Sequence, residues 1–185
     1  MTVDDALLAK AAELTGVKEK STLLREGLQT LVRVESARRL AALGGTDPQA
    51  TAAPRRRTSA PVILVDTSVW IEHLRAADAR LVELLGDDEA GCHPLVIEEL
   101  ALGSIKQRDV VLDLLANLYQ FPVVTHDEVL RLVGRRRLWG RGLGAVDANL
   151  LGSVALVGGA RLWTRDKRLK AACAESGVAL AEEVS

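Results

Sequence analysis

Hydrophobic residues near the start of the chain recur at helical spacing. The spacing predicts one helix over residues 4–14, which Gly16 ends, and a second helix over residues 22–43. The apolar faces consist of Leu7, Leu8, Ala11 and Leu14 in the first helix and Leu24, Leu28, Leu31 and Leu40 in the second. Two such helices, about 40 residues in all, cannot bury enough apolar surface on their own. We therefore expect this segment to dimerise or to dock on a partner.

From residue 62 onward, short apolar runs alternate with helical periods. The run Val62-Ile63-Leu64-Val65 is typical of a strand that is buried on both faces. Further strands are predicted over residues 122–124 and 161–164. Helices are predicted over residues 69–85, 95–102, 110–118, 128–133, 147–157 and 167–175. This alternation predicts an α/β fold with a central, mainly parallel sheet flanked by helices.

The two patterns are separated by a stretch without hydrophobic periodicity. Gly44, Gly45 and Pro48 stop the second helix, because glycine favours the left-handed conformation at a helix end and proline cannot continue a helix. A run of three arginines follows Pro54 in this stretch. We expect three parts: a helical segment over residues 1–45, an extended linker over residues 46–60 and an α/β domain over residues 61–185.

Composition narrows the class of protein. The chain has 185 residues, of which 48% are hydrophobic and 26% charged, with 24 Lys+Arg against 25 Asp+Glu. This balance excludes a disordered chain, which has few apolar residues and a large net charge. The apolar runs are far shorter than the roughly 20 residues of a transmembrane helix, and no signal peptide opens the chain. We expect a cytoplasmic protein without a membrane partner, in which Cys92 and Cys173 are buried thiols.

Charge is distributed unevenly between the two parts. Residues 1–60 hold 10 Lys/Arg and 7 Asp/Glu (+3), whereas residues 61–185 hold 14 and 18 (−4). A small basic part joined to a larger acidic part indicates two modules with different partners.

Four acidic residues stand where an α/β fold places a site. Asp66 and Asp166 directly follow predicted strands, and ligands bind at the carboxyl ends of parallel strands. Glu99 and Asp147 lie within apolar helical stretches, where a carboxylate is costly to bury unless it is paired or binds a cation. Four converging acids would favour Mg²⁺, which can activate water and stabilise charge on a phosphodiester. Each acid also has a plainer interpretation as a helix cap, a turn residue or a solvent-facing residue, and spacing alone leaves both open.

A basic run is the second candidate for function. It consists of Arg135, Arg136, Arg137, Trp139 and Arg141. The arginines could hold phosphates while the tryptophan stacks on a base; the alternative is a solvated helix end. His73, His93 and His126 lack metal-ligand spacing and are interpreted as surface or structural residues. The chain has no Walker A sequence and no G-x-S-x-G elbow, which argues against nucleotide hydrolysis and serine catalysis.

Residues 61–185 resemble the PIN-domain toxins of VapBC toxin–antitoxin systems. The resemblance rests on the motifs Val65-Asp66-Thr67-Ser68-Val69-Trp70, Glu99-Leu100-Ala101-Leu102-Gly103, Val146-Asp147-Ala148-Asn149-Leu150-Leu151 and Leu162-Trp163-Thr164-Arg165-Asp166. It implies an endoribonuclease that depends on Mg²⁺ or Mn²⁺ and cuts RNA such as tRNA or rRNA. The implied catalytic, metal-binding acids are Asp66, Glu99, Asp147 and Asp166, supported by the hydroxyls of Thr67, Ser68 and Thr164. The resemblance selects Glu99 over Glu98, because Glu99 stands four residues before Gly103.

Residues 1–60 resemble the VapB antitoxins of the same systems. The resemblance rests on Thr2-Val3-Asp4-Asp5-Ala6-Leu7-Leu8, Gly16-Val17-Lys18-Glu19-Lys20-Ser21 and Ala37-Arg38-Arg39-Leu40-Ala41-Ala42-Leu43-Gly44-Gly45. It implies a ribbon-helix-helix dimer that binds operator DNA and a tail that fills the toxin's site. Two departures stand out: the two proteins are usually separate chains, and the ribbon strand is shortened here to Met1-Thr2-Val3. The second departure weakens the expectation of DNA binding.

Taken together, the chain is interpreted as a toxin fused to its own antitoxin, acting on RNA and assembling as a homo-oligomer. Arg55, Arg56 and Arg57 are expected to inhibit the acidic site, in the same chain or in a neighbouring one, because a guanidinium grips carboxylate oxygens. The alternative is a catalytically silent DNA-binding regulator in which the α/β domain is a scaffold.

Overall fold

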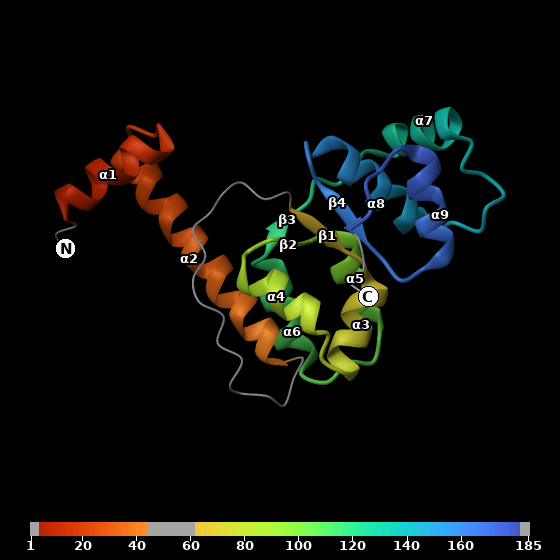
Figure 1. The fold of residues 1–185 in the computed structure, drawn as a ribbon, viewed down its shortest axis with the longest axis horizontal. Helices are drawn as coiled ribbons and strands as arrows, with labels where there is room; N and C mark the ends of the chain where they lie inside the picture. Colours follow the sequence, from red (N-terminus) through yellow and green to blue (C-terminus); the bar gives the residue numbers. More distant parts are fainter. Residues whose placement is uncertain (1–3, 44–61, 182–185) are drawn as a thin grey trace.

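The computed structural model describes residues 4–43 and 62–181. The N-terminal part holds two helices, α1 (Asp5–Thr15) and α2 (Lys20–Leu43). The strands of the remaining part are β1 (Ile63–Val65), β2 (Ala90–Cys92), β3 (Tyr119–Gln120) and β4 (Arg161–Trp163). Its helices are α3 (Thr67–Arg75), α4 (Ala79–Gly86), α5 (Pro94–Leu102), α6 (Arg108–Ala116), α7 (His126–Arg136), α8 (Ala145–Leu156) and α9 (Lys167–Ser176). Figure 1 shows the sheet in the middle of this part, with helices around it.

The four strands form one sheet in the order β3-β2-β1-β4, and every strand pair in it is parallel. The central strand β1 is fully buried, with Leu64 and Val65 at 0% exposure, as the continuous apolar run predicts. The predicted α/β class with a parallel sheet is confirmed. Because the strands are parallel, their carboxyl ends meet at one edge, and β1 and β4 lie side by side there (Figure 1).

Strand β2 was not predicted from the sequence, because Ala90-Gly91-Cys92 lacks the β-branched and aromatic residues typical of strands. Packing requires small residues at this position. A Cβ on Gly91 would stand 2.6 Å from Cε2 of Phe121, so the ring occupies the space that a larger side chain would need. The strand is therefore defined by its neighbours rather than by its own propensity.

Two sequence predictions were wrong. Residues 69–85 form two helices, because Ala76 adopts an extended conformation and Asp78 caps α4 by accepting the Leu81 N–H at 3.1 Å. The strand predicted over residues 122–124 is β3, which lies earlier in the chain. Phe121 N–H donates to the Cys92 carbonyl at 2.9 Å, and Pro122 then has no N–H to continue the ladder.

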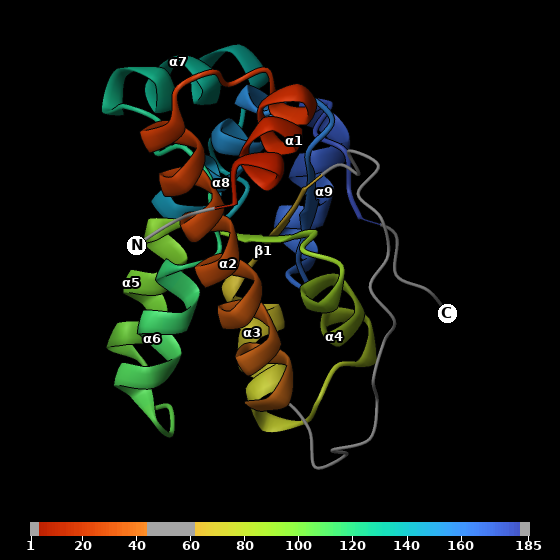
Figure 2. The same cartoon turned by 90° about the vertical axis from the view of Figure 1, so that its left-hand side faces the viewer.

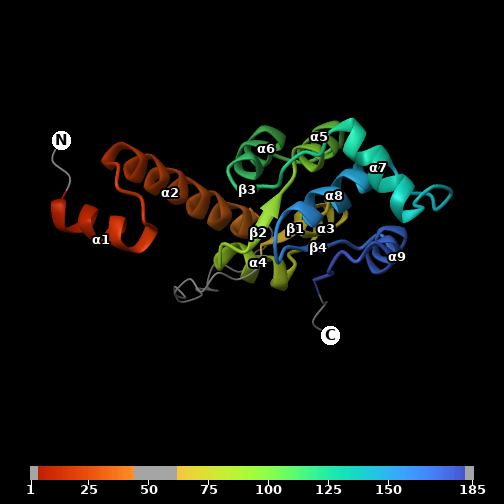
Figure 3. The same cartoon turned by 90° about the horizontal axis from the view of Figure 1, so that it is seen from above.

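Helix α2 joins the two parts through its C-terminal half. Ala37 and Leu40 are each 1% exposed, whereas Leu28 and Leu31, nearer its start, are 62% and 56% exposed. Figure 2 shows α2 lying between α4 and α6, and Figure 3 shows α1 at the far end of α2, away from the sheet. The antitoxin-like segment is thus packed on the α/β domain mainly through α2, whose C-terminal half is the more deeply buried.

Two polar contacts fix this half of α2. The Arg33 guanidinium binds the Asp88 carboxylate through both oxygens, with Nε–Oδ1 and Nη2–Oδ2 distances of 2.9 Å. His73, which is 1% exposed, lies 3.2 Å through Nε2 from the Leu40 carbonyl. Its Nδ1 accepts the Asp78 N–H at 3.2 Å, so the ring proton is on Nε2 and is donated to Leu40. A neutral imidazole therefore connects α2 to the loop before α4.

Acidification is expected to lower the free energy of unfolding and to weaken the packing of α2 on the α/β domain. Burial lowers the pKa of His73 and of His93 below the usual 6.5. Below that pH the unfolded chain binds more protons than the folded one, so the free energy of unfolding falls by up to about 1.4 kcal/mol per pH unit for each histidine. Urea denaturation between pH 8 and 5 measures this slope. His73→Gln is expected to flatten it, and His126→Gln, at an exposed position, is the matched control.

An unchanged slope in His73→Gln would contradict this account, because glutamine does not titrate in the range.

Both cysteines are free and buried, as predicted. Burial raises the pKa of the Cys92 and Cys173 thiols to about 12, so neither is a ready thiolate nucleophile near neutral pH. No helix in residues 4–43 or 62–181 combines the length and the apolar character that a membrane crossing requires.

Candidate active site

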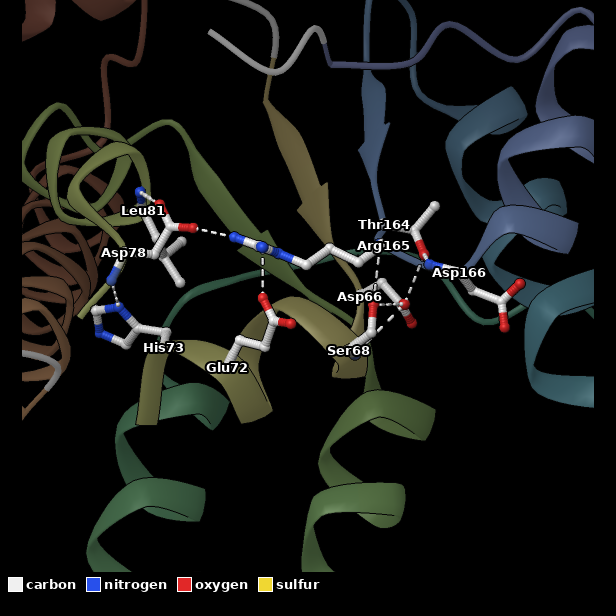
Figure 4. Close-up of polar contacts among 9 residues, drawn as sticks. All are labelled: Asp66, Ser68, Glu72, His73, Asp78, Leu81, Thr164, Arg165 and Asp166. Carbon is white, nitrogen blue, oxygen red and sulfur yellow. Dashed lines mark hydrogen bonds and ion pairs between the residues drawn. The ribbon is translucent and has the colours of Figure 1, made fainter. Parts of the chain in front are cut away.

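Asp66 lies at the carboxyl end of β1 and caps α3. Its Oδ2 accepts hydrogen bonds from the Ser68 hydroxyl at 2.6 Å, the Thr164 hydroxyl at 2.7 Å and the Ser68 N–H at 3.4 Å (Figure 4). The residue is only 6% exposed, and all three bonds fall on one oxygen. The helix-cap interpretation is therefore correct, and it leaves Oδ1 outside these three bonds.

Asp166 occupies the equivalent place after β4. Its Oδ1 caps α9 by accepting the N–H groups of Arg168 at 2.6 Å and Leu169 at 3.1 Å. Its own N–H donates to the Thr164 hydroxyl at 3.0 Å. Since the same hydroxyl donates to Asp66, the buried Thr164 connects the two aspartates directly.

Asp147 comes to this edge from the first turn of α8. Its Oδ2 accepts the Gly144 N–H at 2.7 Å. Burial raises the pKa of Asp147, and the negative charges of Asp66 and Asp166 raise it further, against the effect of the Gly144 bond. Asp147 is thus close enough to Asp66 and Asp166 to be repelled by both.

Glu99 faces the same region from α5, through a hydrogen bond of 2.5 Å that its Oε2 accepts from the Thr67 hydroxyl. Thr67 is the residue that follows Asp66. The charge of the neighbouring Glu98 raises the pKa of His93, whereas burial lowers that pKa. Adjacent residues lie about 100° apart on a helix, so the two glutamates face different directions.

The donor set fits a hard divalent cation. Among the residues that the structure describes, no three acidic, histidine or cysteine side chains converge closely enough to form a ready-made metal cage. An open set of carboxylates and hydroxyls is nevertheless what Mg²⁺ uses, because this ion keeps several waters and needs only a few carboxylates. The structural observation that favours a cation here is that Thr164 holds Asp66 and Asp166 together at the sheet edge. The charges of both aspartates also repel the carboxylate of Asp147 and raise its pKa.

Asp147→Asn is expected to stabilise the metal-free protein by relieving this repulsion, raising its melting temperature by about 2–4 °C. It should also reduce the additional stabilisation that Mg²⁺ gives the parent. Thermal melting in EDTA and in Mg²⁺ measures both effects. Asp113→Asn, at an exposed position on α6, is the control. A variant that melts lower than the parent in EDTA would contradict the repulsion.

The basic run lies at the end of α7 and in the loop that leads to α8. Arg135 and Arg136 are in the last turn of α7, and Trp139 is 61% exposed. Arg141 forms an ion pair with Glu175 of α9, and its Nε donates to the Arg137 carbonyl at 2.9 Å. The loop continues to Gly142, whose carbonyl accepts from the side chain of Arg168, the residue that also donates its N–H to Asp166.

This connection places the loop beside the acidic edge, although Arg141 is engaged within the protein. Arg55, Arg56 and Arg57 lie outside the described residues.

Two functional connections were missed by sequence reasoning. Arg165 forms ion pairs with Glu72 and Asp78 (Figure 4). Buried His93 lies 3.0 Å through Nε2 from the Ser153 hydroxyl of α8, and its Nδ1 caps α5 by accepting the Leu95 N–H at 3.1 Å. A charged residue between Thr164 and Asp166 was the available signal for the first connection. Nothing in local spacing pointed to the second.

Comparison with known proteins agrees with this geometry. The family described as PIN domain matches residues 63–175, which cover most of the strands and helices above. The chain belongs to the PIN-domain family. Its first part belongs to a second family, described as the bacterial antitoxin of type II toxin–antitoxin systems, VapB, which matches residues 1–43. The PIN domain is thus preceded by a VapB-type segment in one chain.

Curated relatives also match the two parts of the chain separately. "Ribonuclease VapC32" from two strains of Mycobacterium tuberculosis is 99% identical over 124 residues, which are 67% of this chain and 100% of that protein. "Antitoxin VapB32" from the same two strains is 98% identical over 59 residues, which are 32% of this chain and 91% of that protein. No solved structure gives a significant match. The predicted resemblance to a fused VapBC pair is confirmed.

Proposed function

We propose that the chain is a metal-dependent endoribonuclease toxin fused to its own antitoxin, and that it hydrolyses phosphodiester bonds in RNA such as tRNA or rRNA. The observation that carries the proposal is the hydrogen-bonded link through Thr164 between Asp66 and Asp166 at the carboxyl ends of β1 and β4. Asp147 lies close enough for both of their charges to raise its pKa. The near-identity of residues in this domain to a protein named as a ribonuclease supports the same reaction.

Asp66, Glu99, Asp147 and Asp166 are proposed to hold Mg²⁺, with Mn²⁺ as the alternative. When bound, the ion would activate water and stabilise the charge that develops on the phosphate. The protein's own contribution is orientation. Thr164 and Ser68 hold Asp66 through its Oδ2, and Thr67 holds Glu99 through its Oε2. These hydroxyls fix the orientation of the two carboxylates.

The test is incubation of the full chain, and of residues 61–185 alone, with total RNA in Mg²⁺ or in EDTA. The shorter form is justified because the Mycobacterium tuberculosis ribonuclease is a separate chain of comparable length. Site-specific cleavage that needs Mg²⁺ is expected, stronger in the shorter form if the antitoxin segment inhibits. Absence of cleavage by both forms would overturn the proposal and favour a silent regulatory role.

Trp139 is proposed to stack on an RNA base, with Arg135 and Arg136 holding nearby phosphates. Trp139→Ala is expected to raise KM for RNA about tenfold with kcat nearly unchanged, since stacking contributes roughly 1–3 kcal/mol per base. Trp139→Phe keeps an aromatic face and should retain most of the affinity. Steady-state cleavage of a labelled RNA measures both constants. Equal loss in the alanine and phenylalanine variants would exclude stacking as the cause.

A further inference from the structure

Arg165 connects three elements through its side chain. It follows Thr164 at the end of β4, and its guanidinium forms ion pairs with Glu72 on α3 and with Asp78 before α4 (Figure 4). The Asp78 side chain is only 12% exposed, and its other oxygen, Oδ1, accepts the Leu81 N–H. The Asp78 carboxylate is therefore fixed by the helix that it caps, and the guanidinium lies between Asp78 and Glu72.

The backbone of the same residue lies within the candidate site. Arg165 N–H donates to the Ser68 hydroxyl at 3.1 Å, and that hydroxyl donates to Asp66 Oδ2 at 2.6 Å. On either side of Arg165, Thr164 donates to Asp66, and Asp166 N–H donates to Thr164. The turn over residues 164–166 thus carries hydrogen bonds that hold two of the proposed metal-binding aspartates.

We propose that Arg165 is a positioning residue for the acidic site: its two ion pairs hold this turn in the conformation that orients Asp66 and Asp166. The effect of Arg165 on catalysis rests on the proposed function. Its effect on the turn depends only on hydrogen bonds and ion pairs within this chain.

Geometry explains why one side chain can have this effect. A single ion pair at this degree of exposure contributes little. Two pairs on one planar guanidinium fix its direction as well as its position. Glu72 is on the helix that Asp66 caps, so the same helix is tied to the turn after β4 at its second residue, Ser68, and again at Glu72. A turn held at both its backbone and its side chain cannot shift without breaking both sets of bonds.

Another role for Arg165 is direct contact with an RNA phosphate, since its side chain is 39% exposed. The two roles predict different results. A phosphate contact would change KM for RNA and leave the metal-free protein unaltered. A positioning role changes the turn before any RNA or metal is present.

The first experiment is amide hydrogen exchange in the metal-free full chain, measured for residues 165 and 166. Arg165→Ala keeps both amides and removes both ion pairs, so exchange at these positions should accelerate about tenfold. Arg165→Lys and Glu72→Gln each leave part of the network and should give smaller accelerations. Arg161→Ala, which replaces an exposed arginine at the other end of β4, should leave exchange at these two amides unchanged.

The second experiment measures Mn²⁺ affinity by calorimetry and the kinetic constants for RNA in the same variants. Arg165→Ala should weaken Mn²⁺ binding and lower kcat several-fold while KM changes little, and Arg165→Lys should recover part of both. Unchanged amide exchange in Arg165→Ala, or a rise in KM alone, would overturn the positioning role. If the parent cleaves no RNA, the proposed function fails, and the exchange result still decides whether Arg165 holds the turn.

Discussion

Asp66→Asn is expected to reduce Mg²⁺-dependent RNA cleavage by roughly a hundredfold to a thousandfold. The substitution keeps the shape of the side chain and removes a charge that is only 6% exposed and lies beside two other aspartates. Asparagine can still accept from Ser68 and Thr164 through its amide oxygen, so the turn and the cap of α3 should survive. Cleavage of a labelled RNA by residues 61–185 over a range of Mg²⁺ concentrations measures the loss.

The control for this prediction is Asp113→Asn, which makes the same chemical change on the exposed face of α6. It should cleave at the parent rate. Circular dichroism and melting temperature show whether Asp66→Asn remains folded. A folded Asp66→Asn protein with the parent's rate would remove the central acid from the mechanism and with it the nuclease assignment.

The second large effect is expected at Glu99. Glu99→Gln should reduce cleavage by about a hundredfold or more, because it removes the negative charge that Thr67 holds beside Asp66. Glu98→Gln should keep nearly the full rate, since Glu99 accepts the Thr67 hydrogen bond and Glu98 lies about 100° away around the helix. Parallel assays of the two variants measure the difference between adjacent positions on one helix.

The reverse order of effects would show that the helix is out of register with the site, and the motif that selects Glu99 would be misassigned. The pair is a sharp test because both substitutions exchange one exposed glutamate for glutamine. Differences in stability or in helix propensity between them are therefore small.

The strands show which parts of the fold could be predicted from local sequence. The apolar run that contains β1 is recognisable because a parallel strand buried on both faces must be apolar at every position. Strand β2 was invisible because Gly91 is required by the nearby Phe121 ring, a contact between residues 30 positions apart in the chain. The hydrophobic periodicity of residues 69–85 also continues across the break between α3 and α4, so the sequence predicted one helix there. The break is at the helix cap that Asp78 forms.

In the candidate site, too, some features could be predicted from the sequence and others could not. Sequence by itself determined the α/β class, the two-part organisation of patterns and the acids worth examining, because strand ends and acids within apolar helical stretches leave a local signature. The resemblance to VapBC systems selected Glu99 from two adjacent glutamates. Only the tertiary structure decided that Thr164 joins Asp66 to Asp166, that Glu99 meets Thr67, and that Arg165 is held by Glu72 and Asp78. Apart from the local bond between Asp166 and Thr164, these contacts join residues far apart in the chain. Packing of the sheet and helices, rather than spacing along the sequence, brings them within bonding distance.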